Sequence, residues 1–354
     1  NRSLAAFYSR AITDPDWGLR ATWRGASAEA TALSLRDAGG GQILRASAYG
    51  TAAHAQPGGS QASFARGRLQ REALGVGLLA SLRDYGSGRR NEVLGSDFSW
   101  ALGGTDLLRG HLLASCTTAG FGADSTGEEE PVLLRTPAEA GHNLWLSWRR
   151  RNEDWANALH LEQVSPRFAN DNGFVSQSGF RRVTAQLHRR LGSKDWAGFQ
   201  AHELELQLDI KQTETLADAR FEVPGGELIE RQLRPGFWLA MARNTGVWGH
   251  LGLDRQRARS GGRLHAPRSL LLGIESNPAP WLTWISAEFE WGRLLDVEAD
   301  RLGRGANLHL EAKLRSPLPW GLWLELEQQL GQGFVRSDAL GRRSFTERNS
   351  QTLA

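Results

Sequence analysis

Charged side chains recur at every second position in several segments, and they are the residues whose types and spacing could do chemistry. In residues 203–206, for example, Glu203 and Glu205 alternate with Leu204 and Leu206. An extended chain points successive side chains to opposite faces, so each such segment has one charged face and one apolar face. Mixed charges on one face can pair across strands or set the field of a pore.

No catalytic set is recognisable among these residues. Barrel hydrolases need a serine, histidine and amide set, or paired aspartate and histidine, at the membrane boundary. None of the nine histidines stands in such a motif, and His160, His188 and His309 fall on charged faces by alternation. Residues 128–130 and 170–173 are rich in oxygen ligands but lack the spacing of a calcium loop. No catalytic residue, metal or cofactor is therefore assigned, and an enzymatic role is not favoured.

Composition excludes several protein classes. The net charge is 42 − 39 = +3, which gives no case for a nucleic-acid partner. The one cysteine, Cys116, excludes an internal disulfide. The longest nearly apolar stretch, residues 73–82, is too short to span a bilayer as a helix. A mean hydropathy of −0.42 is nevertheless compatible with a transmembrane barrel, because only alternate residues of its strands face lipid.

Connections between the alternating segments are short and long in turn. Short connections are expected at residues 25–27, 71–73, 103–105, 152–154, 191–195, 244–246, 277–280 and 316–319. Longer polar loops are expected at residues 37–60, 84–90, 118–141, 165–178, 211–226, 257–267, 296–305 and 336–343. Bacterial outer-membrane barrels have short periplasmic turns and long outer loops. The pattern therefore predicts an all-β fold, an antiparallel transmembrane β-barrel of about eighteen visible strands.

In such a barrel the charged face lines the lumen and the apolar face meets lipid. The residues expected to line the lumen are Arg66, Arg68, Arg149, Arg182, Glu203, Glu205, Glu288, Glu290, Glu311, Lys313, Glu325 and Glu327. The residues expected to face lipid are Leu204, Leu206, Leu208, Leu308, Leu310, Leu322, Leu324 and Leu326. Tryptophan prefers the membrane–water boundary, and several indoles directly follow short connections. The expected interfacial girdle is Trp155, Trp196, Trp248, Trp281 and Trp320.

Three blocks of the first half of the chain resemble an uncharacterised family of outer-membrane barrel domains. The first is Phe-Tyr-Ser-Arg-Ala-Ile at residues 7–12, and the second is Arg-Asn-Glu-Val-Leu-Gly-Ser-Asp-Phe at residues 90–98. The third is residues 164–174, followed by Gly-Phe-Arg-Arg at residues 179–182. Ala11, Asn172 and Gln177 depart from the family pattern, which weakens any role for a loop charge there. The resemblance implies a domain that follows an N-terminal carbohydrate-binding-like module, and it implies no catalytic residues.

These observations lead to one main expectation and two alternatives. The whole chain, residues 1–354, is expected to be a single barrel domain of a longer protein in the outer membrane of a Gram-negative bacterium. It is expected to act as a porin-like pore, or as a scaffold for a periplasmic or surface module, with a weaker link to glycan handling. The alternatives are a barrel hydrolase acting at the membrane and a soluble all-β carbohydrate-binding protein.

Further expectations concern partners and the ends of the chain. The expected partners are outer-membrane lipid, the barrel-assembly machinery and the carbohydrate-binding-like module. Residues 346–353 alternate too little to be a convincing closing strand. An open barrel would leave unpaired backbone groups in hydrocarbon, so the barrel is expected to be truncated at both ends. Residues 1–12 and 344–354 are expected to be splayed or to pair imperfectly with each other.

Overall fold

In the computed structural model, every element with described bounds is a β-strand. The structure describes residues 4–5, 11–56, 58–86, 88–118, 120–122, 132–134, 138–196, 199–219, 222–317, 323–336 and 343–353. No helix in these residues is long and apolar enough to cross a membrane. The chain divides into two compact units, which share four strands.

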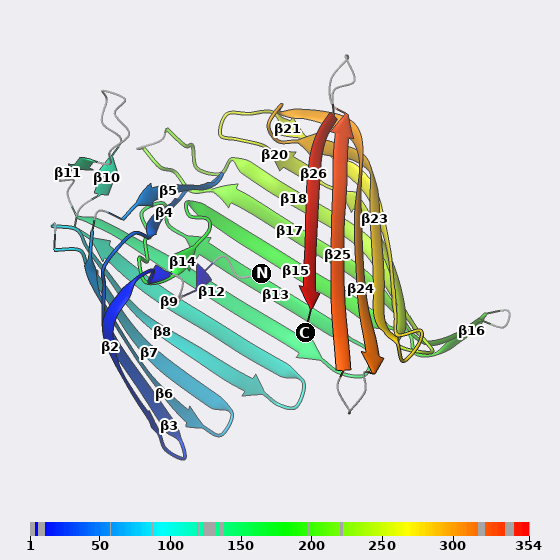
Figure 1. The fold of residues 1–354 in the computed structure, drawn as a ribbon, viewed down its shortest axis with the longest axis horizontal. Helices are drawn as coiled ribbons and strands as arrows, with labels where there is room; N and C mark the ends of the chain where they lie inside the picture. The colour runs from blue at the N-terminus through cyan, green and yellow to red at the C-terminus, as the bar shows by residue number, and fades with distance from the viewer. Residues whose placement is uncertain are drawn as a thin grey trace. The chain divides into compact units, whose positions relative to one another are not determined.

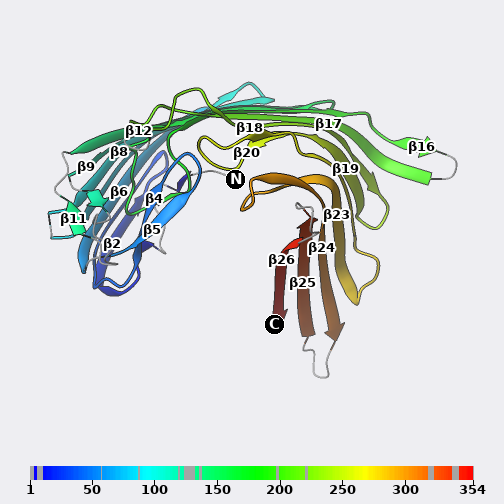
Figure 2. The same cartoon turned by 90° about the horizontal axis from the view of Figure 1, so that it is seen from above.

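Unit 1 comprises residues 1–149, 159–183 and 213–227. Its sheet is a meander in which each long strand pairs antiparallel with the next, in the order β2, β3, β6, β7, β8 and β9. These strands are β2 (Pro15–Arg24), β3 (Ala28–Asp37), β6 (Ser60–Arg71), β7 (Leu74–Asp84), β8 (Arg90–Leu102) and β9 (Asp106–Thr117). The hairpin of β4 (Gln42–Ala46) and β5 (Thr51–Ala55) interrupts the connection between β3 and β6 and lies to one side of this sheet (Figures 1 and 2).

Unit 2 comprises residues 150–158, 184–212 and 228–354. Its sheet is a second meander, in the order β18, β19, β22, β23, β24, β25 and β26. These strands are β18 (Leu228–Met241), β19 (Thr245–Leu253), β22 (Arg268–Ser276), β23 (Leu282–Asp296), β24 (Arg301–Pro317), β25 (Trp323–Arg336) and β26 (Arg343–Leu353). The short strands β20 (Arg255–Arg257) and β21 (Leu264–His265) form a small hairpin between β19 and β22.

Four further long strands have residues in both units and belong to the same barrel-type sheet. They are β12 (Glu139–Arg151), β13 (Ala156–Val164), β15 (Phe180–Arg190) and β17 (Phe199–Thr215). The remaining short strands are β1 (Leu4–Ala5), β10 (Gly120–Gly122), β11 (Val132–Leu134), β14 (Phe174–Val175) and β16 (Lys194–Trp196). The number of long strands agrees with the expectation of about eighteen.

Each sheet has one strongly exposed apolar face. In unit 1, Leu19, Leu78 and Leu94 are 71%, 70% and 65% exposed. In unit 2, Leu272, Ile274, Phe289, Trp291 and Leu310 are exposed on one face. Charged residues such as Glu288, Glu290 and Glu311 alternate with them in β23 and β24. A soluble monomer rarely exposes so large an apolar surface, whereas the lipid-facing side of a transmembrane barrel is apolar. The prediction of an all-β antiparallel barrel fold is confirmed, and its exposed apolar faces fit a membrane-spanning barrel.

Several expected boundaries differ from those observed. Strand β17 continues to Thr215, so residues 211–215 are strand rather than loop. The loop expected at residues 296–305 is a turn at 297–300, because β23 and β24 extend to it in continuous register. Residues 343–353 form β26, which pairs with β25 along its whole length, so the weak alternation there was misleading. At the other end, Leu4 and Ala5 pair with β14 inside unit 1.

The expected lipid-facing leucines have different outcomes. Leu206 is 48% exposed and Leu310 is 36% exposed, as expected. Leu208, Leu308 and Leu326 are half-buried. Leu204 is only 9% exposed, and the expectation is wrong for this residue. Its backbone hydrogen-bonds with the turn at residues 191–192, which lies beside it. The side chains of Leu322 and Leu324 lie outside the described residues.

Candidate functional site

Glycines on the charged face of unit 1 leave room for a cleft. A Cβ atom added at Gly77 would lie 2.5 Å from the Asp97 carboxylate, and one at Gly95 would lie 2.1 Å from Leu113. A Cβ atom at Gly75 would collide with the tips of Gln70, Arg68 and Ser99. The side chains of neighbouring strands can therefore lie flat across β7 and β8.

The resulting arginine cleft has a volume of about 360 Å³ and is lined by Arg66, Arg68, Asp97, Ser99, Arg109, His111 and Trp145, among others. Arg66 makes a bidentate ion pair with Asp97, with Nη2–Oδ distances of 2.9 and 3.0 Å. Arg68 donates to the neutral Ser99 hydroxyl at 2.9 Å and to the Gln70 amide oxygen at 3.2 Å. Three guanidinium groups thus share the cleft with one carboxylate, and the cleft carries net positive charge.

Aromatic rings close one side of the arginine cleft. The rings of His111 and Trp145 stack with centroids 5.5 Å apart, and Trp145 stacks in turn on His160 at 6.1 Å. His111 also shares a hydrogen bond with the fully buried Asn143 amide oxygen. The stack holds a flat apolar surface beside the guanidinium groups.

Nearer the long loops, residues 165–179 run over the same face of unit 1, and we call this segment the latch loop. Its closest approach is at Gly141, where an added Cβ atom would lie 2.3 Å from the Phe168 backbone nitrogen. His142 and Ser165 exchange hydrogen bonds at the same crossing, which anchors the start of the latch loop to β12.

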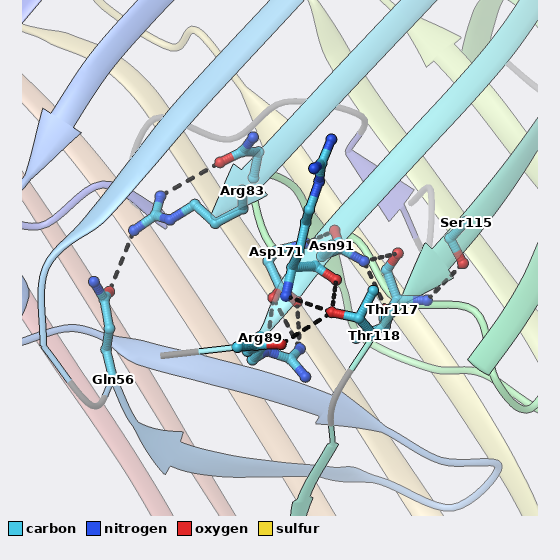
Figure 3. Close-up of polar contacts among 12 residues, drawn as sticks. Gln56, Arg83, Arg89, Asn91, Ser115, Thr117, Thr118 and Asp171 are labelled. Carbon is cyan, nitrogen blue, oxygen red and sulfur yellow. Dashed lines mark hydrogen bonds and ion pairs between the residues drawn. The ribbon is translucent and has the colours of Figure 1, made fainter. Parts of the chain in front are cut away.

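The first polar anchor beneath the latch loop is the buried ion pair of Arg83 and Asp37. Their side chains are 1% and 0% exposed, and the Nη2–Oδ2 distance is 2.5 Å. Arg83 also donates to the Gln56 amide oxygen at 3.2 Å and to Asn172 of the latch loop at 3.4 Å. The Asn172 amide in turn donates to Ser81 and to the Leu82 carbonyl. The cluster therefore joins β3, β7 and the latch loop in one network. Figure 3 shows the bond from Arg83 to Gln56.

The second anchor is the ion pair of Arg89 with Asp171 of the latch loop. Three hydrogen bonds of 2.8 to 3.1 Å join them, and the side chains are 5% and 2% exposed. The Tyr85 ring lies between Arg83 and Arg89, whose guanidinium carbons are 5.6 and 5.8 Å from its centroid. Burial, followed by the nearby Asp171 charge, raises the pKa of the Tyr85 hydroxyl, so that group stays neutral.

Two segments far apart in the sequence, residues 90–98 and 164–174, meet at this point. Asn91 accepts from the Asp171 backbone N–H at 2.9 Å and donates to the Ala169 carbonyl at 3.1 Å. It also donates to Thr117, while the Ala169 N–H donates to Ser115 (Figure 3). Within the oxygen-rich segment 170–173, Asp171 and Asn172 thus bind protein groups. Residues 128–130 lie outside the described residues, and no cluster elsewhere in the described chain could hold a metal ion.

The remaining predicted charges of unit 1 lie outside the arginine cleft. Arg182 in β15 donates to Thr213 and Gln177 and lies 3.4 Å from Glu162. Arg149 is exposed near the tight-turn end of β12. Residues Arg66 and Arg68 are thus the predicted positions that the cleft brings together.

The predicted charges of unit 2 form a second, mostly acidic group on its charged face. Glu203 and Glu205 pair with Arg190, and Glu205 also contacts His188. Lys313 bridges Glu311 and Glu327 at 3.2 and 3.5 Å. Glu290 accepts from Asn307, and Glu288 accepts from the Trp248 indole. The Glu325 side chain lies outside the described residues.

Trp248 corrects the expected girdle. Its indole stacks on Trp238, with centroids 5.2 Å apart, and lies over Gly273, where a Cβ atom would be 2.1 Å away. Because it donates to Glu288, Trp248 lies on the charged face, whereas a girdle residue must lie on the apolar face. Trp281 is 62% exposed, and Trp155 packs under the Arg189 guanidinium. The side chains of Trp196 and Trp320 lie outside the described residues.

Sequence reasoning missed Arg83, Arg89 and Asp171 as a group. Each lies in or beside an expected loop, and nothing local distinguishes it from a solvated charge. Arg89 and Asp171 are 82 residues apart, so no local pattern could have paired them.

No family model and no curated protein matches this sequence. Among solved structures, the chain is similar to a BenF-like porin from Pseudomonas fluorescens Pf-5, with a TM-score of 0.47 and 10% identity over 92% of this chain and 96% of that chain. Pseudomonas aeruginosa OccK2 (OpdF) gives a TM-score of 0.46 and 11% identity over 95% and 93% of the two chains. Acinetobacter baumannii OccAB4 gives 0.43 and 8% over 98% and 100%. The fold assignment rests on the strand pairings and exposures above, since similarity at this level carries no functional assignment.

Proposed function

We propose that this chain is a passive outer-membrane pore whose arginine cleft favours anionic solutes. The observation that carries the proposal is the excess of positive charge in the cleft, where no carboxylate among the described residues pairs with Arg68 or Arg109. A charged surface beside low-dielectric walls concentrates ions of opposite sign. A guanidinium group also offers a planar fork of donors that suits carboxylate and phosphate.

The latch loop supports the same proposal. It lies on the face that carries the cleft and is fixed there by the buried Arg89–Asp171 ion pair and by the hydrogen bonds of Asn172. A segment anchored on the inner side of a barrel wall would narrow the lumen. It would also keep the cross-section of the lumen constant beside the cleft.

Conductance in planar lipid bilayers tests this function directly. Purified protein under a KCl gradient should show a reversal potential that indicates preference for chloride over potassium. The variant Arg66→Gln/Arg68→Gln should move that potential toward zero. Arg90→Gln is the matched control, because Arg90 pairs with Glu92 on the opposite face. Absence of conductance, or cation preference in the wild type, would refute the proposal.

A role in glycan passage is a second proposal, supported by the Trp238–Trp248 stack beside Glu288. An indole face packs against the C–H face of a sugar, and a neighbouring carboxylate accepts from its hydroxyls. Trp248→Ala should abolish quenching of tryptophan fluorescence by an oligosaccharide, whereas Trp291→Ala on the apolar face should not. Equal quenching in both variants would argue against it.

The partners expected from the sequence also remain proposals. A carbohydrate-binding-like module would be tested by reading the gene upstream of the codon for Asn1. Dependence on the barrel-assembly machinery would be tested by depleting that machinery and measuring the folded fraction in the membrane. A scaffold role requires that removal of the module leaves the barrel folded.

A further inference from the structure

Four arginines of unit 2 stand directly opposite one another on neighbouring strands. Arg268 of β22 pairs in register with Arg293 of β23, which pairs with Arg304 of β24, which pairs with Arg336 of β25. All four residues are exposed. We call them the rim arginine row.

The row lies on the apolar face of the sheet, at the end where the long loops join the strands. Arg293 has the same parity in β23 as the exposed Phe289 and Trp291, and the charged Glu288 and Glu290 have the other. The row adjoins the turn at residues 297–300, which is on the long-loop side. In an outer-membrane barrel this side faces the cell exterior, so the row lies at the headgroup level of the outer leaflet.

Like charges directly opposite on neighbouring strands repel each other. In the described chain no carboxylate makes an ion pair with any member of the row, and the adjacent Glu298 makes none with it either. The corresponding positions of unit 1 are different. There the arginines at the long-loop end of the apolar face have carboxylate partners. The pairs are Arg36–Asp16, Arg90–Glu92 and Arg181–Glu214. The rim arginine row therefore lacks the counter-charge that the chain supplies elsewhere.

Below the row the same face carries an aromatic groove of about 730 Å³. It is lined by Arg268, Arg293 and Arg304 at one end and by Phe289, Trp291 and Phe334. Phe289 and Trp291 stack with their centroids 5.9 Å apart. A ligand that fits this surface must place anionic groups against the arginines and hydrocarbon against the rings.

We propose that the rim arginine row and the aromatic groove bind a phosphorylated glycolipid of the outer leaflet, with its phosphates on the arginines and an acyl chain along the groove. Guanidinium groups bind phosphate in a bidentate geometry, and basic clusters at the membrane surface recognise anionic headgroups. The proposal rests on the location of the barrel in the outer membrane. It does not depend on conductance, so failure of the pore proposal leaves it standing.

The test measures binding of lipid A 1,4′-bisphosphate to the detergent-purified protein by native mass spectrometry. Arg268→Gln/Arg293→Gln/Arg304→Gln should weaken binding more than about tenfold, and Arg293→Gln alone about fivefold, from the typical contribution of each basic residue at a membrane surface. The matched control is Arg36→Gln/Arg90→Gln/Arg181→Gln, which removes as many arginines from the same face of unit 1. It should leave binding within about twofold, since those arginines already have partners. Heat-modifiable gel migration confirms that each variant is folded. If the triple variant does not fold, the binding of lipid A to Arg293→Gln tests the proposal.

Four outcomes would overturn the proposal. The first is unchanged binding in the row variants, and the second is an equal loss in the control variant. The third is equally tight binding of a lipid A that has lost both phosphates. Competition by inorganic phosphate at the lipid's own concentration would identify a free-phosphate site and would also overturn the lipid assignment.

Discussion

Replacement of Asp171 by asparagine should release the latch loop from the wall of unit 1. The substitution keeps the size of the side chain and removes the charge that Arg89 faces. Arg89 makes three hydrogen bonds to this carboxylate, and the two side chains are 5% and 2% exposed. The guanidinium group would stay buried without its counter-charge.

The magnitude follows from the burial of the pair. Loss of one partner of a buried ion pair costs about 3–5 kcal/mol, because a buried charge is left uncompensated. Each 1.4 kcal/mol is a tenfold change, so the docking equilibrium of the latch loop shifts by about two to three and a half orders of magnitude. The double variant Arg89→Met/Asp171→Asn removes both charges and should lose much less than the sum of the single changes.

Limited proteolysis and hydrogen exchange of residues 165–179 measure this release. The Asp171→Asn protein should be cut within the latch loop and should exchange its amides there, while the strand amides of β6 to β8 stay protected. Arg181→Gln serves as the control, since Arg181 is 59% exposed in its pair with Glu214 and should have a small effect. Protection of the latch loop equal to that of the wild type would refute the reasoning. So would a double variant that is less protected than Asp171→Asn.

Further predictions address the loop crossing, the facing of strands and the effect of pH. Gly141→Val should displace the latch loop, because even a Cβ atom would overlap its backbone, and proteolysis should detect the change. Leu310→Arg should block assembly, at a cost of about 2–4 kcal/mol for a charge at the bilayer midplane, whereas Glu311→Arg should assemble, as heat-modifiable migration would show. The hydrogen bond from His265 lowers the pKa of Asp300. The ionised Asp300 therefore stabilises the fold at pH values above the ordinary aspartate pKa, and this stabilisation is lost as pH falls through the lower pKa of the folded state. The thermal stability of Asp300→Asn should therefore depend less on pH below about pH 4 than that of the wild type.

The sheets were largely predictable because their signal is local and repeated. Alternation of charged and apolar residues assigns the two faces of β24 within one short segment, and the paired positions agree with it. The same rule, applied consistently, would have placed Trp248 with His250 and away from Leu251. The girdle was predicted from the nearness of tryptophans to turns. Nearness to a turn does not show which face of the sheet a side chain occupies.

The contacts of the latch loop and the rim arginine row were not predictable, because they depend on contacts between distant segments. Arg89 and Asp171 are 82 residues apart, and each alone reads as an ordinary loop charge. Likewise, Arg268 and Arg336 become members of one row only when the register of four strands is known. A shift of one residue in any of these pairings would turn a member of the row to the other face.

The buried charges beneath the latch loop also determine the order of assembly steps. The hairpins of β6 to β9 close over short turns and can pair as soon as their residues are available. Arg83 and Arg89 cannot be withdrawn from water at low cost until Asp37 and Asp171 have both arrived, and the second of these lies beyond β13. Because long-range closure is slow relative to hairpin formation, docking of the latch loop is a late step that follows the formation of this part of the wall. An assembly intermediate before that step keeps a hydrated, positively charged inner face, which the finished protein has covered.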